Sequence, residues 1–72
     1  MLTEHLQIFA EYSRKLDAGE FTDTDFLYLQ RLEPEIIQAY QEKTYSRYEY
    51  EAIIRLYHIF MDKGREFLRI GG

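Results

Sequence analysis

The strongest constraint on this chain is a run of apolar residues at helical spacing that keeps its phase from residue 46 to residue 69. Placed at 100° per residue, the run forms an apolar sector about 220° wide, against roughly 100° for an ordinary surface helix. The sector is centred on Ile53, Leu56, Tyr57, Phe60, Gly64, Phe67 and Leu68. Two arrangements would cover such a helix: neighbours on both of its sides, or one edge buried in an oligomer or partner interface.

A local signal defines the start of this helix, and the apolar pattern sets its length. Ser46 and Glu49 have the spacing of a capping box, in which the serine oxygen and the glutamate carboxylate each accept an N–H of the first turn. Gly64 lies in phase with the apolar residues, and the pattern continues beyond it. The sequence therefore predicts a helix over about 46–69, with Gly64 allowing the close approach of a neighbour instead of ending the helix.

A second apolar stripe predicts a helix over about 3–18, followed by Gly19 as a left-handed terminator. The next helix has a clear start. With Thr22 as its N-cap, Phe21 and Phe26 occupy the two positions of a hydrophobic staple. These signals set the link between the first two helices at only a few residues, which favours antiparallel packing.

The middle helix is predicted over about 23–43 and is expected to kink or break at Pro34, because proline lacks an N–H and clashes with the preceding turn. We see no strand alternation, internal repeat or linker. The predicted fold is therefore all-α: one domain, 1–72, forming an antiparallel three-helix bundle of 3–18, 23–43 and 46–69. A separate helix after the break would raise the count to four.

Chain length makes packing critical. A domain of 72 residues without cysteine has only marginal stability from its own core, and no disulfide can staple it, which leaves packing or oligomerisation. The net charge of −4 is divided unevenly. Residues 1–42 hold three basic and nine acidic groups, giving −6, and residues 43–72 hold six basic and four acidic groups, giving +2. This asymmetry fits either mutual attraction of the two halves or a charged binding surface.

Catalytic and metal-binding patterns are weak. His5 and His58 fall on different predicted helices, and no second group stands at a spacing that would orient either as a general base. His58 and Asp62 are four residues apart, but Arg55 on the same face opposes a cation there. We expect His5 to be simply exposed. The sequence thus predicts no enzyme, no metal site and no cofactor.

Surplus apolar and tyrosine residues favour a binding role. Tyr45 and Tyr48 lie at a helix junction, where they are expected to be partly exposed and to serve as contacts, since tyrosine is common at protein interfaces. Other apolar residues extend the two edges of the last helix. The predicted partner-binding residues are Tyr45, Tyr48, Ala52, Ile54, Ile59, Met61 and Ile70.

The resulting hypothesis is a small non-enzymatic protein-binding module, acting as a regulator, inhibitor or assembly factor, with a homodimer as an open alternative. Two other functions remain. A small helical DNA-binding regulator is disfavoured by the net negative charge. An acidic inhibitor that mimics nucleic acid and binds a basic target protein would use the carboxylates of residues 1–42. With no leader or membrane-spanning pattern, the expected location is the cytoplasm and no membrane partner is expected.

Overall fold

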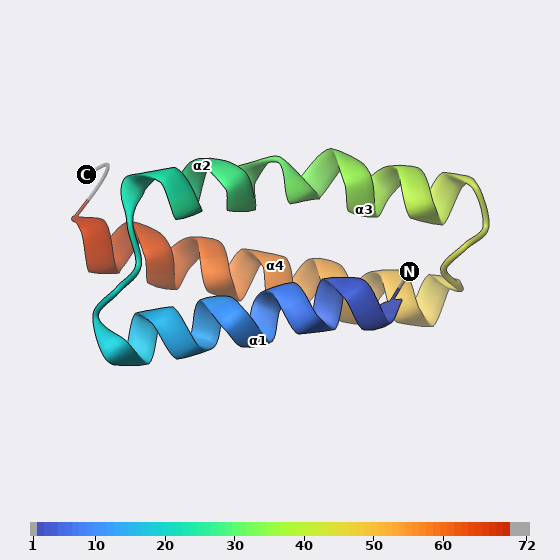
Figure 1. Ribbon diagram of the computed structural model, residues 1–72. Coiled ribbons are helices and arrows are strands. Elements are labelled where there is room, and N and C mark those ends of the chain that lie inside the picture. The colour runs from blue at the N-terminus through green and yellow to red at the C-terminus, as the bar shows by residue number, and fades with distance from the viewer. Residues whose placement is uncertain (1, 70–72) are drawn as a thin grey trace.

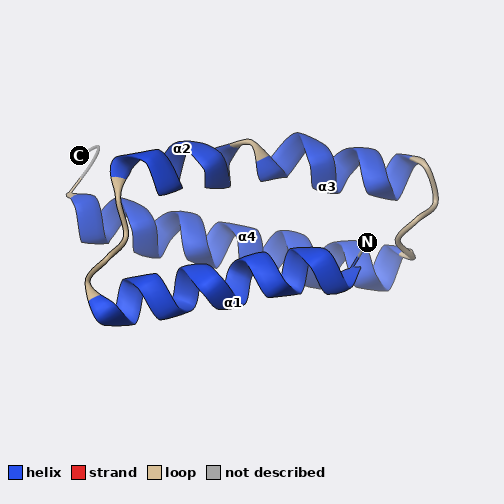
Figure 2. Ribbon diagram, in the orientation of Figure 1, coloured by secondary structure: helices blue, strands red, loops and turns tan. Residues whose placement is uncertain are grey.

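The computed structural model describes residues 2–69, which form four helices in chain order. They are α1 (Leu2–Ala18), α2 (Asp23–Gln30), α3 (Leu32–Gln41) and α4 (Arg47–Leu68), and this range contains no strand (Figures 1 and 2). The prediction of an all-α bundle is confirmed. Within the same range, no helix combines the length and the apolar character needed to cross a membrane.

Three helical rods lie side by side in the bundle. α2 and α3 follow one another along one rod, which runs antiparallel to both α1 and α4 (Figure 1). α4 packs against α1, α2 and α3, whereas α1 approaches α2 and α3 much less closely. Of the two arrangements considered for the wide apolar sector of α4, the central position between two neighbours is the one observed.

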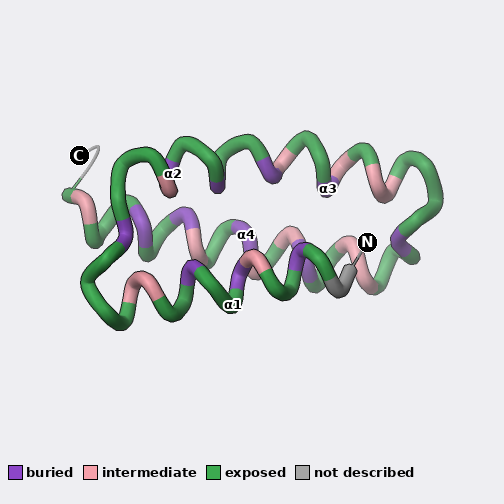
Figure 3. The backbone as a smooth tube through the Cα atoms, in the orientation of Figure 1, coloured by how far each residue is buried: buried purple, intermediate pink, exposed green. Residues whose placement is uncertain are grey.

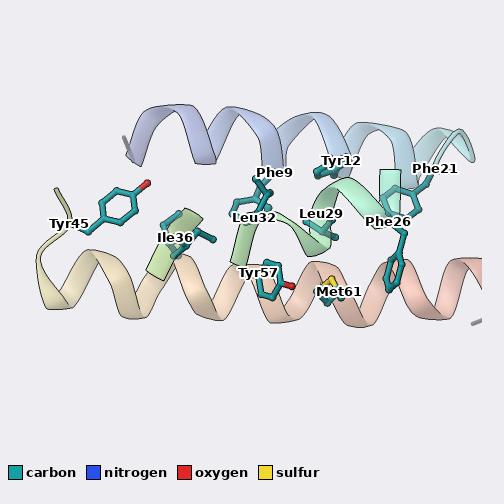
Figure 4. Close-up of a cluster of buried hydrophobic side chains, with 11 residues drawn as sticks. Phe9, Tyr12, Phe21, Phe26, Leu29, Leu32, Ile36, Tyr45, Tyr57 and Met61 are labelled. Carbon is teal, nitrogen blue, oxygen red and sulfur yellow. The ribbon is translucent and has the colours of Figure 1, made fainter. Parts of the chain in front are cut away.

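One hydrophobic core runs the length of the bundle between the rods (Figures 3 and 4). Helix α4 contributes a buried row at helical spacing, and four side chains of the core are almost completely inaccessible to solvent. The buried apolar residues are Phe9, Tyr12, Phe21, Phe26, Leu29, Leu32, Ile36, Tyr45, Ile53, Tyr57 and Met61.

Gly64 lies where α4 packs tightly against the start of α2. A Cβ atom on this residue would lie 3.0 Å from a ring carbon of Phe21 and 3.0 Å from one of Phe26. Those two rings are the predicted hydrophobic staple at the start of α2, where Thr22 and Asp25 cap each other's backbone N–H groups. The prediction that Gly64 admits a close neighbour without ending the helix is confirmed.

The expected break of the middle helix is observed, and it lies at Arg31, three residues before Pro34. Pro34 lies in the first turn of α3, where its missing N–H leaves no helical hydrogen bond unmade. Pro34 has no N–H to donate to the carbonyl of Gln30, four residues earlier. The hydroxyl of Tyr57 donates to this carbonyl at 3.5 Å, which ties the break to α4.

Two links between helices turn through a left-handed residue. Gly19 has φ of 71° and Lys43 has φ of 63°. In both turns the N–H of the next residue, Glu20 or Thr44, donates to a carbonyl in the last turn of the helix, the Schellman pattern. Only Gly19 avoids the steric cost of this conformation, because glycine has no Cβ.

We therefore expect Lys43→Gly to raise the free energy of unfolding by about 1 kcal/mol, since it removes the penalty on a left-handed non-glycine residue. Gly19→Ala should lower it by a similar amount. Urea denaturation followed by circular dichroism measures both. Lys63→Gly is the matched control. It makes the same change at an exposed position inside α4 and should destabilise by about 1 kcal/mol. Destabilisation by Lys43→Gly would contradict the argument.

The packing at Gly64 predicts that Gly64→Leu destabilises the fold by more than about 2 kcal/mol, because the added side chain must displace two buried rings. Gly64→Ala should cost less, because the gain of about 1 kcal/mol in helix propensity offsets part of the overpacking. Thermal denaturation compares both with Lys63→Leu, which adds the same side chain at the exposed neighbouring position. Equal effects at residues 63 and 64 would show that the close approach does not matter.

Candidate functional site

An exposed apolar edge remains on α4 after the bundle is assembled. Tyr48 is 83% exposed, Ile59 is 43% exposed, and Ala52 is also exposed. At 100° per residue these three positions fall within about 40° of one another on the helix. Ile54, a predicted contact residue on the other edge of the helix, is half-buried against the core. Three of the predicted contact residues thus share one solvent-facing strip, which we call the α4 edge (Tyr48, Ala52 and Ile59).

Tyr45 and Met61 are not on the surface. Tyr45 is 3% exposed and Met61 is 7% exposed, so the expectation that Tyr45 is partly exposed was wrong. The loop after α3 folds inward at Tyr45, whose ring points toward α1 (Figure 4). Met61 is buried because α4 is covered on both of its sides. The seventh predicted contact, Ile70, lies outside the described residues.

His5 is also buried, which corrects the expectation that it is exposed. Only 8% of its side chain is accessible, and its Nδ1 atom is hydrogen-bonded to the hydroxyl of Tyr45. Its other nitrogen, Nε2, lies 3.9 Å from a carboxylate oxygen of Glu35 on α3. The bond joins α1 to the α3–α4 loop across 40 positions in the sequence, so no local spacing could have signalled it.

The surroundings of this pair hold both groups in their neutral forms. Burial lowers the pKa of His5, and the N-terminal ammonium adds to the effect, while Glu35 and Glu4 act in the opposite direction. Burial likewise raises the pKa of the Tyr45 hydroxyl, with smaller contributions from Glu49 and Glu4. A neutral imidazole and a protonated phenol can share one hydrogen bond without burying a charge.

A polar hollow of about 400 Å³ opens beside His5, between α1 and α3. Its walls include three carboxylates, those of Glu4, Glu35 and Glu42, and no lysine or arginine lines it among the described residues. Glu42 accepts a hydrogen bond from Gln38, which also lines the hollow, at 3.1 Å. The hollow therefore presents concentrated negative charge next to a buried neutral histidine.

A second hollow, of about 310 Å³, lies between α1 and α2. Its apolar walls include Ile8 and the rings of Tyr12 and Tyr28, whose centroids are 6.4 Å apart. Lys15 and Asp25 line the same hollow and form an ion pair at 2.9 Å, with both side chains largely sheltered from solvent. This hollow differs from the first because its floor is apolar and its charges are paired.

The charged face of α4 consists of alternating ion pairs. Arg47 pairs with Glu51 at 3.2 Å, and Arg65 pairs with Asp62 at 3.4 Å. Among residues 2–69 the structure groups no three side chains of the types that hold a metal ion. The carboxylate four residues from His58 is thus engaged by an arginine of its own helix.

Comparison of the chain with protein-family models, curated proteins and solved structures finds no match. Function must therefore be argued from the α4 edge, the two hollows and the His5–Tyr45 pair themselves.

The burial of His5 predicts a loss of stability in mild acid. Because its pKa is lower in the folded than in the unfolded chain, the unfolded chain binds the proton first as the pH falls below about 6.5. The free energy of unfolding should therefore decrease from pH 7 downwards, before carboxylates begin to protonate. Urea denaturation at a series of pH values measures the slope.

His5→Gln should flatten this slope between pH 7 and pH 5, because the amide has no proton to gain in that range and can still hydrogen-bond to Tyr45. His58→Gln is the matched control, since His58 is exposed, and it should keep the slope of the unmodified chain. A slope that survives His5→Gln and disappears in His58→Gln would refute the assignment.

Proposed function

We propose that this protein is a non-enzymatic protein-binding module, a regulator, inhibitor or assembly factor, that contacts its partner through the α4 edge. The observation that carries the proposal is the 83% exposure of Tyr48 on the same strip of helix as Ile59 and Ala52. A rigid aromatic ring with one hydroxyl gives a large contact area at a small cost in conformational entropy.

Neighbouring apolar surface would enlarge this contact. Leu6 on α1 is 43% exposed and lies one turn before Phe9, whose ring stacks on that of Phe60 in α4 with centroids 5.2 Å apart. Stable interfaces bury about 800 Å² on each partner. That is about a sixth of the 5133 Å² surface of this chain, so a partner must reach beyond the edge itself.

A second copy of the chain is one candidate partner. In a two-fold dimer the same strip would face itself, and each Tyr48 would contact the apolar residues of the other copy. The small size of the chain and its lack of disulfides favour such an arrangement, since association buries surface that a single core cannot.

Nucleic acid is less well supported as a partner. The arginines of α4 alternate with carboxylates, and Arg47 and Arg65 are paired with Glu51 and Asp62. A recognition helix with this pattern would repel phosphate as much as attract it. The acidic residues of α1 and α3 fit a basic protein surface better than they fit a polyanion.

The α4 edge predicts that a Tyr48→Ala, Ile59→Ser double variant weakens partner binding about tenfold or more, because hot-spot aromatics contribute most of the affinity of an interface. Affinity capture with the unmodified chain and with the variant compares the recovered partners. Sedimentation equilibrium of both proteins at high concentration tests self-association.

Leu27→Ser is the matched control for this experiment, because Leu27 is 58% exposed on α2 and lies away from the strip. It should leave both capture and sedimentation unchanged. Partners recovered equally well by all three proteins, together with a strict monomer throughout, would contradict the proposal.

A further inference from the structure

The seam between α1 and the α2–α3 rod is the most open part of the bundle. α4 packs on both rods, but α1 approaches α2 and α3 far less closely. The two hollows described above both open along this seam, one against α2 and one against α3, and no residue of α4 lines either. We call this surface the seam groove. Because α4 packs on both rods, its exposed edge faces away from the groove.

Among the described residues, most of the charges that line the seam groove are negative. Of these residues, five contribute carboxylates to the two hollows, and Lys15 contributes an ammonium group. That cation is already paired with Asp25, and Arg14 just outside pairs with Glu11 at 2.7 Å. The hollow against α3 holds three of the carboxylates and no cation among the described residues. An occupant of complementary charge must therefore be basic.

The groove also has an apolar anchor point. Ile8 and the rings of Tyr12 and Tyr28 surround the hollow against α2, and Tyr28 is 52% exposed although it is a large aromatic side chain. An apolar side chain inserted there would cover the exposed part of this ring. A groove with one apolar socket and an acidic rim is the surface that an amphipathic helix with basic flanks recognises.

We propose that the seam groove binds a basic amphipathic helix of another protein, with an apolar side chain against Ile8 and the exposed part of the Tyr28 ring and a lysine or arginine in the hollow of Glu35 and Glu42. The two hollows are separated by seven residues of α1, from His5 to Tyr12, or about 10 Å at 1.5 Å per residue. The docked helix therefore carries its cation seven positions from its apolar anchor, where both face the same side.

This binding surface is distinct from the α4 edge and does not depend on it. A partner at the α4 edge is selected by apolar and tyrosine contact, whereas an occupant of the seam groove is selected by positive charge at a fixed spacing. The two surfaces can therefore be tested separately on the same 72-residue chain.

The test uses synthetic helical peptides of about 18 residues as probes. The first has a central leucine with a lysine seven positions away on each side. In the second the two lysines are replaced by glutamates. The third has the same composition as the first, but the lysines stand five positions from the leucine, on the opposite face of the helix. Fluorescence anisotropy of labelled peptides gives affinities, and amide chemical shifts of the ¹⁵N-labelled chain locate the site.

We expect saturable binding of the first peptide, with shifts concentrated around His5, Tyr12, Tyr28 and Glu35. The second and third peptides should bind at least tenfold more weakly. Tyr28→Ala should weaken binding of the first peptide about tenfold, because it removes a wall of the apolar hollow. Glu35→Gln should weaken the same binding several-fold at low salt, because it removes one carboxylate charge. Glu35 is well suited to this substitution because its side chain is 63% exposed.

Leu27→Ala is the control variant, because Leu27 is the exposed neighbour of Tyr28 but lines neither hollow, and it should bind the first peptide normally. Three results would each overturn the proposal: no saturable binding, equal binding of the peptide with displaced lysines, or shifts confined to Tyr48 and Ile59. The last result would support the α4 edge as a binding surface and rule out the groove as one. Each of the two proposals can therefore fail without the other.

Discussion

The burial of α4 on two sides is the constraint on which the rest of the structure depends. A chain of this size without disulfides has little apolar surface to bury, and here one helix, α4, packs against all the others. Gly64 lies against two phenylalanine rings at the start of α2, and Phe60 stacks on Phe9 of α1, so α4 is in contact with both of its neighbours. Each fully buried aliphatic side chain contributes about 1.5–3 kcal/mol, which makes this shared contact the main source of stability.

A shared central helix has a structural consequence. The two rods that flank α4 are held at a distance set by α4 and do not close fully on each other. The gap at one end is bridged by a polar contact, the His5–Tyr45 hydrogen bond, and at the other by the sheltered Lys15–Asp25 pair. Polar bridges of this kind fix the register of the rods, but they cannot fill volume as apolar side chains do. The hollows of the seam groove remain for that reason.

Local chemistry made much of this fold predictable. The N-cap at Thr22, the capping box at Ser46, the left-handed Gly19 and the glycine in phase on α4 all depend on residues within one or two turns, and each is found in the structure. The break expected at Pro34 lies at Arg31, because proline disturbs the turn before it. The burial of His5 and Tyr45 was missed because it depends on a contact between distant segments, which helical periodicity does not report.

The wide apolar sector of α4 allowed two arrangements, neighbours on both sides or one edge in an interface, and only the observed packing distinguishes them. The candidate sites differ in the same way. Tyr48, Ala52 and Ile59 could be chosen from the helical pattern, but the hollows depend on the incomplete packing of α1 against the α2–α3 rod, which the pattern does not predict.

The position of His5 couples the fold to the charge of the seam groove. Its ring forms part of the wall of the acidic hollow, with Nε2 directed toward Glu35, while Nδ1 is held by Tyr45. A cation seated among the carboxylates would oppose a proton on the imidazole, and a proton there would in turn oppose the cation. Because linkage is reciprocal, occupancy of the groove by a basic helix would extend the stability of the fold toward lower pH, and acid would weaken the binding. Binding of such a helix would then depend on pH through His5, a residue that has only 8% of its side chain exposed.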